Sequence, residues 1–432
     1  MRASKYIITT YTPGMTVNTN FIKTLKRYCC KNSARLLILT TKTIDSDAIL
    51  SNEIDTRNIV TIDKSLNDNL LVKVLPVSPT CANPIAGLTS LSHGELSVIV
   101  AGNKQVLKHL PSYSGVRLIA STGSCCAREY GDSLAAAKAA SEHILGALIV
   151  EIENKQVFHL RNIIANKDGE FFDIGCKYTP QGAKYVGIDS LVAGDIHAEE
   201  SDPKVIDLLC KFGKKHSIRQ LFLHDIHSGS GVTHHIAGDV VLQSKINNEM
   251  TLENSLDKCV SIVNQMANNY KHVFVVASNH DAHTEDWLRE GRFVSDKINL
   301  KTGAFLFNKL VNDFLSPLQA WFQHRKAANN VIFLEENMNL MAGKYIVSKH
   351  GHAGTNGSRA LPKGIRSLTG HTHSAEIKQD GSIVVGHSCD VSKVNYLSGA
   401  SSWSQSFAIV HEDGFAQLIN LVGHKFQNKG EK

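Results

Sequence analysis

The stretch Thr369-Gly370-His371-Thr372-His373, which directly follows an apolar run, decides how the rest of this chain is interpreted. Four other polar fragments also come directly after apolar runs: Asp195-Ile196-His197, His224-Asp225, Ser278-Asn279-His280-Asp281 and Ser348-Lys349-His350. Open α/β sheets build their sites at the carboxyl ends of strands. The sequence therefore predicts an α/β fold in which five strand ends assemble one site.

The residue types in these fragments are those of a dinuclear metal centre. Two divalent ions roughly 3.5–4 Å apart can neutralise a phosphate ester, generate hydroxide and stabilise a leaving oxygen. A mixture of carboxylate, amide oxygen and neutral imidazole suits Mn, Fe or Zn. Asp225 is the candidate bridging ligand. The predicted ligands are Asp195, His197, Asp225, Asn279, His350, His371 and His373.

Composition supports a globular protein with such a site. The chain has 432 residues and 21 histidines, and 14 of those histidines lie between His197 and His373. The formal net charge of +6 permits an anionic substrate without requiring one. Nine cysteines without a Cys-x-x-Cys motif favour a reducing cytoplasm over a disulfide framework. No apolar run approaches the length that spans a bilayer, so no membrane association is expected.

The length predicts two domains, and a change in the pattern of apolar runs and turns places their boundary between residues 183 and 184. Alternating strands and helices predict a separate α/β domain in residues 1–183, with helices at residues 103–110 and 133–148. Asn166-Lys167-Asp168-Gly169 predicts a hairpin turn. No phosphate-binding loop and no internal repeat is evident. Oligomerisation or substrate positioning is the expected role of residues 1–183.

The order of these motifs over residues 186–420 resembles the calcineurin-like metallophosphoesterase superfamily. The resemblance implies a four-layer α/β sandwich as the catalytic domain of residues 184–432. It implies a first metal site of Asp195, His197, Asp225 and His373, and a second of Asp225, Asn279, His350 and His371. Asp225 would bridge the two ions together with a hydroxide, which would be the nucleophile.

The same resemblance assigns roles to the catalytic pair. His280 would protonate the leaving oxygen, and Asp281 would orient His280. Two positions depart from the family pattern, because His224 and Ser278 stand where the family usually has glycine. The run Asp225-Ile226-His227-Ser228-Gly229 lacks the second Asp and the Arg of protein serine/threonine phosphatases, which argues against that class.

Of all these expectations, the identity of the substrate has the most alternatives. The favoured hypothesis is a DNA nuclease, similar to the nuclease branch that includes phage-encoded DNases. A phosphodiesterase or phosphatase of nucleotides is the alternative, and a metal-bound scaffold without hydrolysis is the least favoured. Manganese is the favoured metal, with Fe, Zn, Mg and Ni as alternatives, and a homo-oligomer is a further option. Expected substrate contacts are His224, His227, His283, Arg289 and His352.

Three further expectations concern the surroundings of the site. The segment at residues 283–292 is expected to form part of the substrate face, as a helix start capped by Thr284. His387, which ends another apolar run, is a candidate neighbour of the site. Trp287 and Trp403 can stack bases, but a core position is the favoured interpretation for each.

Overall fold

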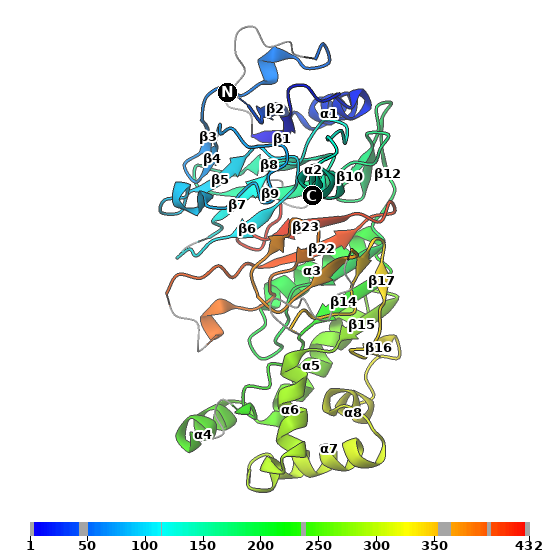
Figure 1. The fold of residues 1–432 in the computed structure, drawn as a ribbon. Coiled ribbons are helices and arrows are strands. Elements are labelled where there is room, and N and C mark those ends of the chain that lie inside the picture. Colours follow the sequence, from blue (N-terminus) through cyan, green and yellow to red (C-terminus); the bar gives the residue numbers. More distant parts are fainter. Residues whose placement is uncertain are drawn as a thin grey trace.

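A computed structural model describes residues 4–42, 51–113, 115–234, 239–352, 364–394 and 399–427. The fold is α/β, as predicted, with two large mixed sheets (Figure 1). The first has ten strands in the order β16 (Val331–Leu334), β15 (His272–Val276), β14 (Gln220–His224), β13 (Ser190–Ala193), β22 (Ser406–Val410), β23 (Ala416–Asn420), β9 (Phe158–Ile164), β8 (Gly146–Ile152), β1 (Lys5–Tyr11) and β2 (Arg35–Thr40).

The second sheet also has ten strands, and a small sheet has three. The order of the second is β17 (Met341–Ala342), β18 (Tyr345–Ile346), β19 (Arg366–Thr369), β21 (Ile383–Val384), β20 (Glu376–Ile377), β6 (Leu107–His109), β7 (Leu118–Ser121), β5 (Ser97–Val100), β4 (Leu70–Val72) and β3 (Lys64–Asn67). The small sheet joins β10 (Phe171–Asp173), β11 (Cys176–Tyr178) and β12 (Ala183–Tyr185).

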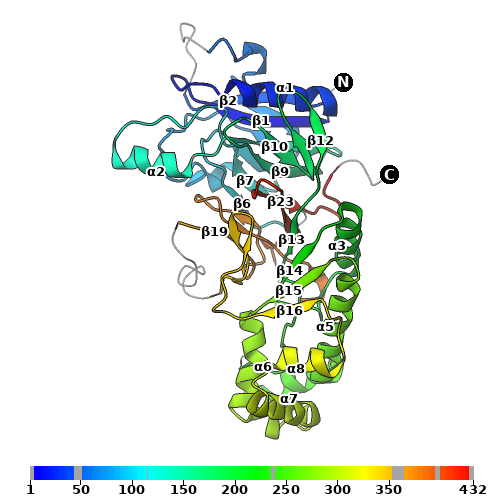
Figure 2. The same ribbon diagram turned by 90° about the vertical axis from the view of Figure 1, so that its right-hand side faces the viewer.

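Eight α-helices lie in the described ranges. They are α1 (Thr19–Asn32), α2 (Leu134–Glu142), α3 (Pro203–His216), α4 (Val240–Glu249), α5 (Leu252–Ala267), α6 (Asn279–Arg289), α7 (Leu300–Asn312) and α8 (Pro317–His324). Helices α3 and α5 run along one face of strands β13 to β16 (Figure 2). None of the helices within these ranges combines the length and apolar character needed to cross a membrane.

The central strands are apolar on both faces because both faces are covered. In β13, all four residues are buried, which is typical of a strand between two packed layers. Val192 and Phe222 of the first sheet share one core cluster with Leu368 and Ile383 of the second sheet. The opposite face of β13 and β14 packs through Leu191 and other side chains on α3 and α5.

Both sheets repeat one set of pairings on the two sides of a central strand pair. In the second sheet, the pairings from either edge to the centre are antiparallel, parallel, parallel and antiparallel, and β20 and β6 pair in the middle. In the first sheet, β13 pairs with β14 and β22 as β1 pairs with β2 and β8. The matched strands also follow one another in the same chain order.

The helix after each first strand repeats as well. Helix α1 and helix α3 are each 14 residues long, and their N-caps are Asn18 and Asp202. Both end at a left-handed serine, Ser33 or Ser217. The chain therefore contains two topologically equivalent halves, although no internal repeat is evident in its sequence. The second half carries the additional elements α4 to α8, β15 and β16 (Figure 1).

The predicted boundary between residues 183 and 184 falls between these halves. Both large sheets continue across it, because β23 pairs with β9 and β20 pairs with β6. The core cluster between the sheets also joins Ile8 and Val192 from the two sides. The halves thus share their hydrogen-bond ladders and a core, and their independence as domains stays a prediction.

One predicted helix is wrong, and another is confirmed over Leu134–Glu142 but was predicted too long. Residues 107–109 of the predicted helix at 103–110 form β6, because Leu107 faces the core between the sheets and pairs with Ala120 and Ile377. The predicted helix at 133–148 ends at Glu142, and Gly146 already begins β8. The predicted turn at 166–169 is confirmed, since an Ala165–Phe171 bridge encloses it.

Candidate metal centre

Four buried side chains meet at the carboxyl ends of β13, β14 and β19. They come from Asp195, His197, Asp225 and His373, and their candidate ligand atoms all lie within 4.8 Å of one another. The His373 Nε2 atom lies 3.1 Å from Asp195 Oδ2 and 3.1 Å from His197 Nε2. Two carboxylates and two imidazoles at this spacing can hold a metal ion. The structure thus brings together the predicted first ligand set.

The remaining predicted ligands lie beside this group. The His350 Nε2 atom is 3.4 Å from Asp225 Oδ2, and His350 Nδ1 is 3.8 Å from Asp195 Oδ1. The His371 Nδ1 atom is 3.1 Å from the amide oxygen of Asn279. All seven predicted ligands therefore belong to one contiguous cluster, with Asp225 between its two parts.

Tight backbone turns produce this convergence. His197, Asp225, His371 and His373 all have positive φ, between 38° and 80°, where non-glycine residues are uncommon. Such conformations cost on the order of 1–3 kcal/mol each and tend to cluster at functional sites. Gly370 fits for a second reason, because a Cβ atom there would come within 2.1 Å of Asp195 Oδ1.

Several buried polar atoms of this cluster have no hydrogen-bond partner among the residues that the structure describes. They are Asp195 Oδ1, Asp225 Oδ2 and both ring nitrogens of His350. Buried polar groups are almost always satisfied in proteins, so a group of such atoms facing one point requires an explanation. A bound cation supplies one, because it satisfies carboxylate oxygens and imidazole nitrogens together.

Metal ligation requires ionised carboxylates and neutral imidazoles, and Asp195 and His197 already have these protonation states. Burial favours a higher pKa for Asp195, but His350 and His373 outweigh it and lower the pKa to about 2. Burial lowers the pKa of His197 to about 4, so this imidazole is neutral. Burial would also lower the pKa of His350, but the carboxylates of Asp195 and Asp225 raise it to about 8, so this imidazole carries a proton at neutral pH that a bound cation would displace.

His280 stands at the edge of the cluster, on the first turn of α6. Its Nε2 atom lies 3.7 Å from Asp225 Oδ2, and its ring centre lies 4.6 Å from that of His197. Its Nδ1 atom lies 2.6 Å from the carbonyl oxygen of Ser228. Because a carbonyl only accepts hydrogen bonds, Nδ1 carries a proton and Nε2 faces the carboxylate cluster.

The predicted partner of His280 has a different position. Asp281 accepts a hydrogen bond from the backbone N–H of Ser278 at 3.0 Å and forms a capping box that starts α6. The contact that fixes the His280 ring therefore comes from Ser228, not from the carboxylate that the resemblance implied. The helix begins at Asn279 with Ser278 as its cap, so the predicted cap at Thr284 is wrong.

Ser278 has a further role that sequence analysis did not assign. Its hydroxyl donates a hydrogen bond of 2.7 Å to Asp225 Oδ1. It thus replaces the glycine usual at this position while fixing the carboxylate that links the two parts of the cluster. The departure from the family pattern noted at Ser278 is compatible with the predicted ligand geometry.

The five predicted substrate contacts lie in different environments. His224 is fully buried, with its ring centre 5.6 Å from that of His350, so it packs beside the cluster. His227 is also buried, 3.3 Å from Glu199. Arg289 pairs with Glu285 at the last turn of α6, about 15 Å along the helix from Asn279. His224 and His227 are thus buried close to the cluster, Arg289 lies at the far end of α6, and their contact with a substrate stays a prediction.

The other two predicted contacts are only partly buried. The ring centre of His283 is 5.0 Å from that of His280. His352 lies 6.2 Å from His371 by ring centres and 3.2 Å from Glu336 by its Nε2 atom. These two histidines remain candidates for contact with a substrate.

His387 and Trp403 lie directly against the cluster. The Trp403 ring meets the His373 ring edge to face at 4.0 Å, and it lies 5.3 Å from His387. The bridge between Asp195 and His387 connects their backbones. His387 is thus the site neighbour that its position after an apolar run predicted. Trp287 is 1% exposed and packs on Phe293, as the core interpretation predicted.

Comparisons with known proteins add one relative. The chain is similar to a protein of Escherichia phage T5 named Protein A1, with 28% identity over 381 residues that cover 81% of this chain and 68% of the relative. No family model matches the chain, and no solved structure matches it. The similarity links the chain to a phage protein whose name states no activity.

Proposed function

We propose that this chain is a metal-dependent phosphodiesterase and that its substrate is DNA. One observation carries the proposal: Asp195, Asp225 and His350 converge with partnerless buried atoms, and His280 faces the same point. A scaffold protein has no use for a proton donor beside a metal cluster. The combination of cluster and donor is what hydrolysis of a phosphate ester requires.

The cluster would hold two divalent ions, with manganese favoured. Asp195, His197, Asp225 and His373 would hold the first, and Asp225, Asn279, His350 and His371 would hold the second. When bound, the ions would neutralise the phosphate and lower the pKa of the attacking water. The mixture of imidazole and oxygen donors suits manganese, iron or zinc.

The chain itself supplies orientation and a proton. His280 presents Nε2 toward the cluster, because Nδ1 is committed to the Ser228 carbonyl. In its protonated form, Nε2 can donate to the oxygen that leaves phosphorus. The His280 side chain retains 23% exposure, which is enough to meet a substrate from solvent. We further propose that the second half forms the four-layer sandwich of the metallophosphoesterases around this site.

A nuclease fits the surroundings better than an enzyme of free nucleotides. The cavity next to Gly229 and Val232, also lined by Met250 and Leu252, holds about 10 Å³, room for one water and not for a nucleotide. A much larger and more open cavity adjoins the His371 loop. An extended substrate that occupies an open groove is typical of a polymer.

The test is an assay of the purified chain with Mn²⁺ on single-stranded DNA, linear duplex DNA and bis-p-nitrophenyl phosphate. His280→Ala and Asp225→Asn serve as the inactive controls. We expect DNA cleavage by the wild type and its loss in both variants.

The outcomes separate the candidate functions. Turnover of the small diester with intact DNA would favour the phosphodiesterase of small molecules. Silence on every substrate, with manganese bound, would refute the hydrolase and favour a metal-bound scaffold.

A further inference from the structure

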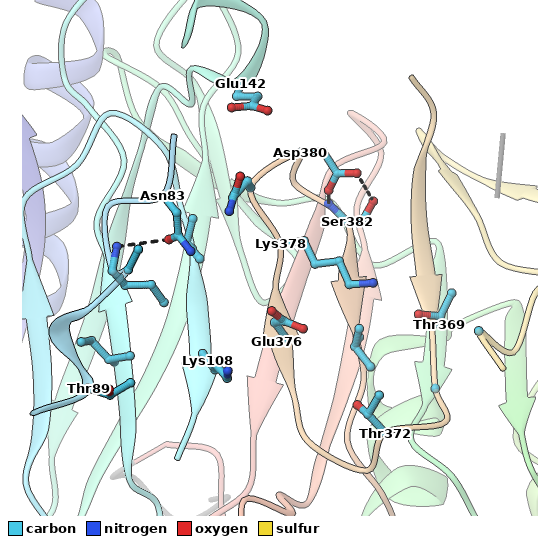
Figure 3. A pocket seen from close by; sticks show the side chains of 18 of the residues that line it. Asn83, Thr89, Lys108, Glu142, Thr369, Thr372, Glu376, Lys378, Asp380 and Ser382 are labelled. Atoms are coloured by element: carbon cyan, nitrogen blue, oxygen red, sulfur yellow. Dashed lines mark hydrogen bonds between the residues drawn. The ribbon is translucent and has the colours of Figure 1, made fainter. Parts of the chain in front are cut away.

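A cavity of about 890 Å³ runs over the outer face of the second sheet. One end is lined by Gly351, Gly370 and Thr372, which belong to the loops that carry His350 and His371. The other end is lined by Asn83 and Thr89 of the first half. Figure 3 shows Thr369 and Thr372 at one end of this groove and Asn83 and Thr89 at the other. The groove thus leads from the metal loops into the first half of the chain.

The floor of the groove crosses the central pair of the second sheet, β20 and β6, where the two halves meet. Leu107 of β6 pairs directly with Ile377 of β20, and both side chains are buried between the two sheets. Because side chains alternate along a strand, Lys108 and Lys378, each one residue further on, face the other way, into the groove. The two lysines occupy matching positions in the two halves.

The charged side chains along this floor differ in whether they have a partner. Within the described ranges, neither Lys108 nor Lys378 has an acidic group at ion-pair distance. Of the three carboxylates in the lining, Glu142 is paired with Lys104, and Asp380 accepts hydrogen bonds from the backbone and hydroxyl of Ser382. Glu376, opposite Lys108 in the strand register, is the remaining one.

We propose that this groove binds the single-stranded nucleic-acid segment that continues from the scissile phosphate. The inference rests on the proposed function of the metal centre and specifies its substrate. Two uncommitted ammonium groups suit two backbone phosphates. Hydroxyl and amide groups such as Thr89, Asn83 and Gln379 suit sugars and base edges.

The same features argue against a duplex. The volume is within the roughly 300–1,000 Å³ of small-ligand pockets, so it accepts a few nucleotides and not a double helix. Glu376 in the floor would repel a phosphate but can accept a hydrogen bond from a base amino group. A single strand can turn its bases toward such a carboxylate, whereas a duplex presents its phosphates.

The test compares Lys108→Ala/Lys378→Ala with Lys23→Ala/Lys26→Ala. The control removes the same charge from exposed positions on α1, which packs on the first sheet. With Mn²⁺, kcat/KM is measured on single-stranded oligonucleotides, on duplex DNA and on bis-p-nitrophenyl phosphate at several salt concentrations. We expect the groove variant to lose about tenfold on oligonucleotides through KM, with a salt dependence shallower by about 1.4 in log–log slope. The small diester should be unaffected.

The outcomes test the groove assignment and the proposed function of the metal centre separately. Unchanged oligonucleotide kinetics in the groove variant, or an equal loss in the control, would overturn the groove assignment. A loss confined to duplex DNA would overturn the single-strand assignment. If the wild type hydrolyses nothing, the proposed function fails. The groove is then decided by fluorescence anisotropy with labelled oligonucleotides: weaker binding in the groove variant alone supports it, and equal or absent binding overturns it.

Discussion

At the end of β13, the side chain of Asp195 accepts a hydrogen bond of 2.8 Å from the backbone N–H of His371. At the matching end of β1, Thr10 accepts one of 3.0 Å from the backbone N–H of Gly102. The backbone N–H groups of both residues also bond to a glycine carbonyl, Gly386 or Gly123, at 3.0 Å. The two halves therefore share the same local backbone, with the predicted metal ligand Asp195 in one and Thr10 in the other.

A second pair of contacts repeats this pattern. His197 meets His373 at 3.1 Å in the second half, whereas Thr12 donates to Asn103 at 2.9 Å in the first. Strand β2 ends at Thr40 and is followed by Thr41 and Lys42, with no carboxylate, whereas Asp225 directly follows β14. The first half thus has neutral groups that satisfy one another where the second half has groups that could hold a cation. The comparison teaches that the backbone of the site does not depend on its ligands.

The strongest test of this comparison replaces a residue of the second half with its counterpart from the first half. Asp195→Thr keeps an acceptor for His371, so we expect the fold to persist while metal binding is lost. Activity should fall by more than about 1,000-fold, because the charge that stabilises the transition state leaves with the ion. Manganese at 100 times its Kd should raise wild-type stability by about 2.7 kcal/mol for each bound ion, and the gain from the site that contains Asp195 should vanish in the variant.

The matched control is Thr10→Ser, which changes the corresponding residue of the first half and retains its hydroxyl. Activity and manganese stabilisation should be as in the wild type, with two ions per chain by titration calorimetry. Four ions per chain, or loss of activity in Thr10→Ser, would show that the first half is not a metal-free copy.

A second prediction tests whether the halves unfold together. Arg161 of β9 holds Asp173 through two hydrogen bonds of 2.6 and 2.9 Å, and Gln417 of β23 donates to the same carboxylate. Asp173 is buried, so Asp173→Asn should lower the free energy of unfolding by about 3 kcal/mol. The exposed pair of Asp207 and Lys211 is the control, and Asp207→Asn should cost less than about 1 kcal/mol.

The pH dependence of this pair has a defined sign. Burial favours a higher pKa for Asp173, but Arg161 outweighs it and lowers the pKa to about 2, below its value in the unfolded chain. The carboxylate therefore stabilises the fold at neutral pH by on the order of 2–3 kcal/mol, and this is lost as the pH falls from about 4 to 2. Urea unfolding at pH 7 and pH 3 measures it. Two separate transitions, of which Asp173→Asn shifts one, would show that the halves unfold independently.

The sequence predicted the site better than it predicted the fold. Asp195, His197, Asp225 and His373 were predictable because each ends an apolar strand and carries metal-binding chemistry. The duplication was not, since Thr10 and Thr12 have none of the side-chain chemistry of Asp195 and His197. Topology is preserved by strand pairing and burial, which tolerate such replacements.

Local errors have similarly physical reasons. The segment at 103–110 was expected to be helical, but Leu107 is inserted between two strands that lie far from it in sequence. The role of Ser228 was also missed, because a backbone carbonyl acts there and any residue type supplies one. Contacts of the backbone leave no signature in a single sequence.

The smallest predicted effect concerns a contact that the second half has and the first half lacks. Glu199 accepts a hydrogen bond of 3.1 Å from the backbone N–H of Ser228, whose carbonyl receives His280 Nδ1. Its chain counterpart in the first half, two residues after Thr12, is Gly14. We therefore expect Glu199 to act as a positioning residue, and Glu199→Ala should lower kcat on DNA by about tenfold, typical of an outer-shell contact.

The choice of substrate distinguishes positioning from a general loss of structure. An alkoxide leaving from DNA needs the proton of His280, whereas nitrophenolate leaves without one, so Glu199→Ala should affect bis-p-nitrophenyl phosphate much less. Glu199→Gln keeps an oxygen acceptor for Ser228 and should restore most of the activity on DNA. Equal losses on both substrates, or lost manganese stabilisation, would assign Glu199 to folding of the metal centre and not to the orientation of His280.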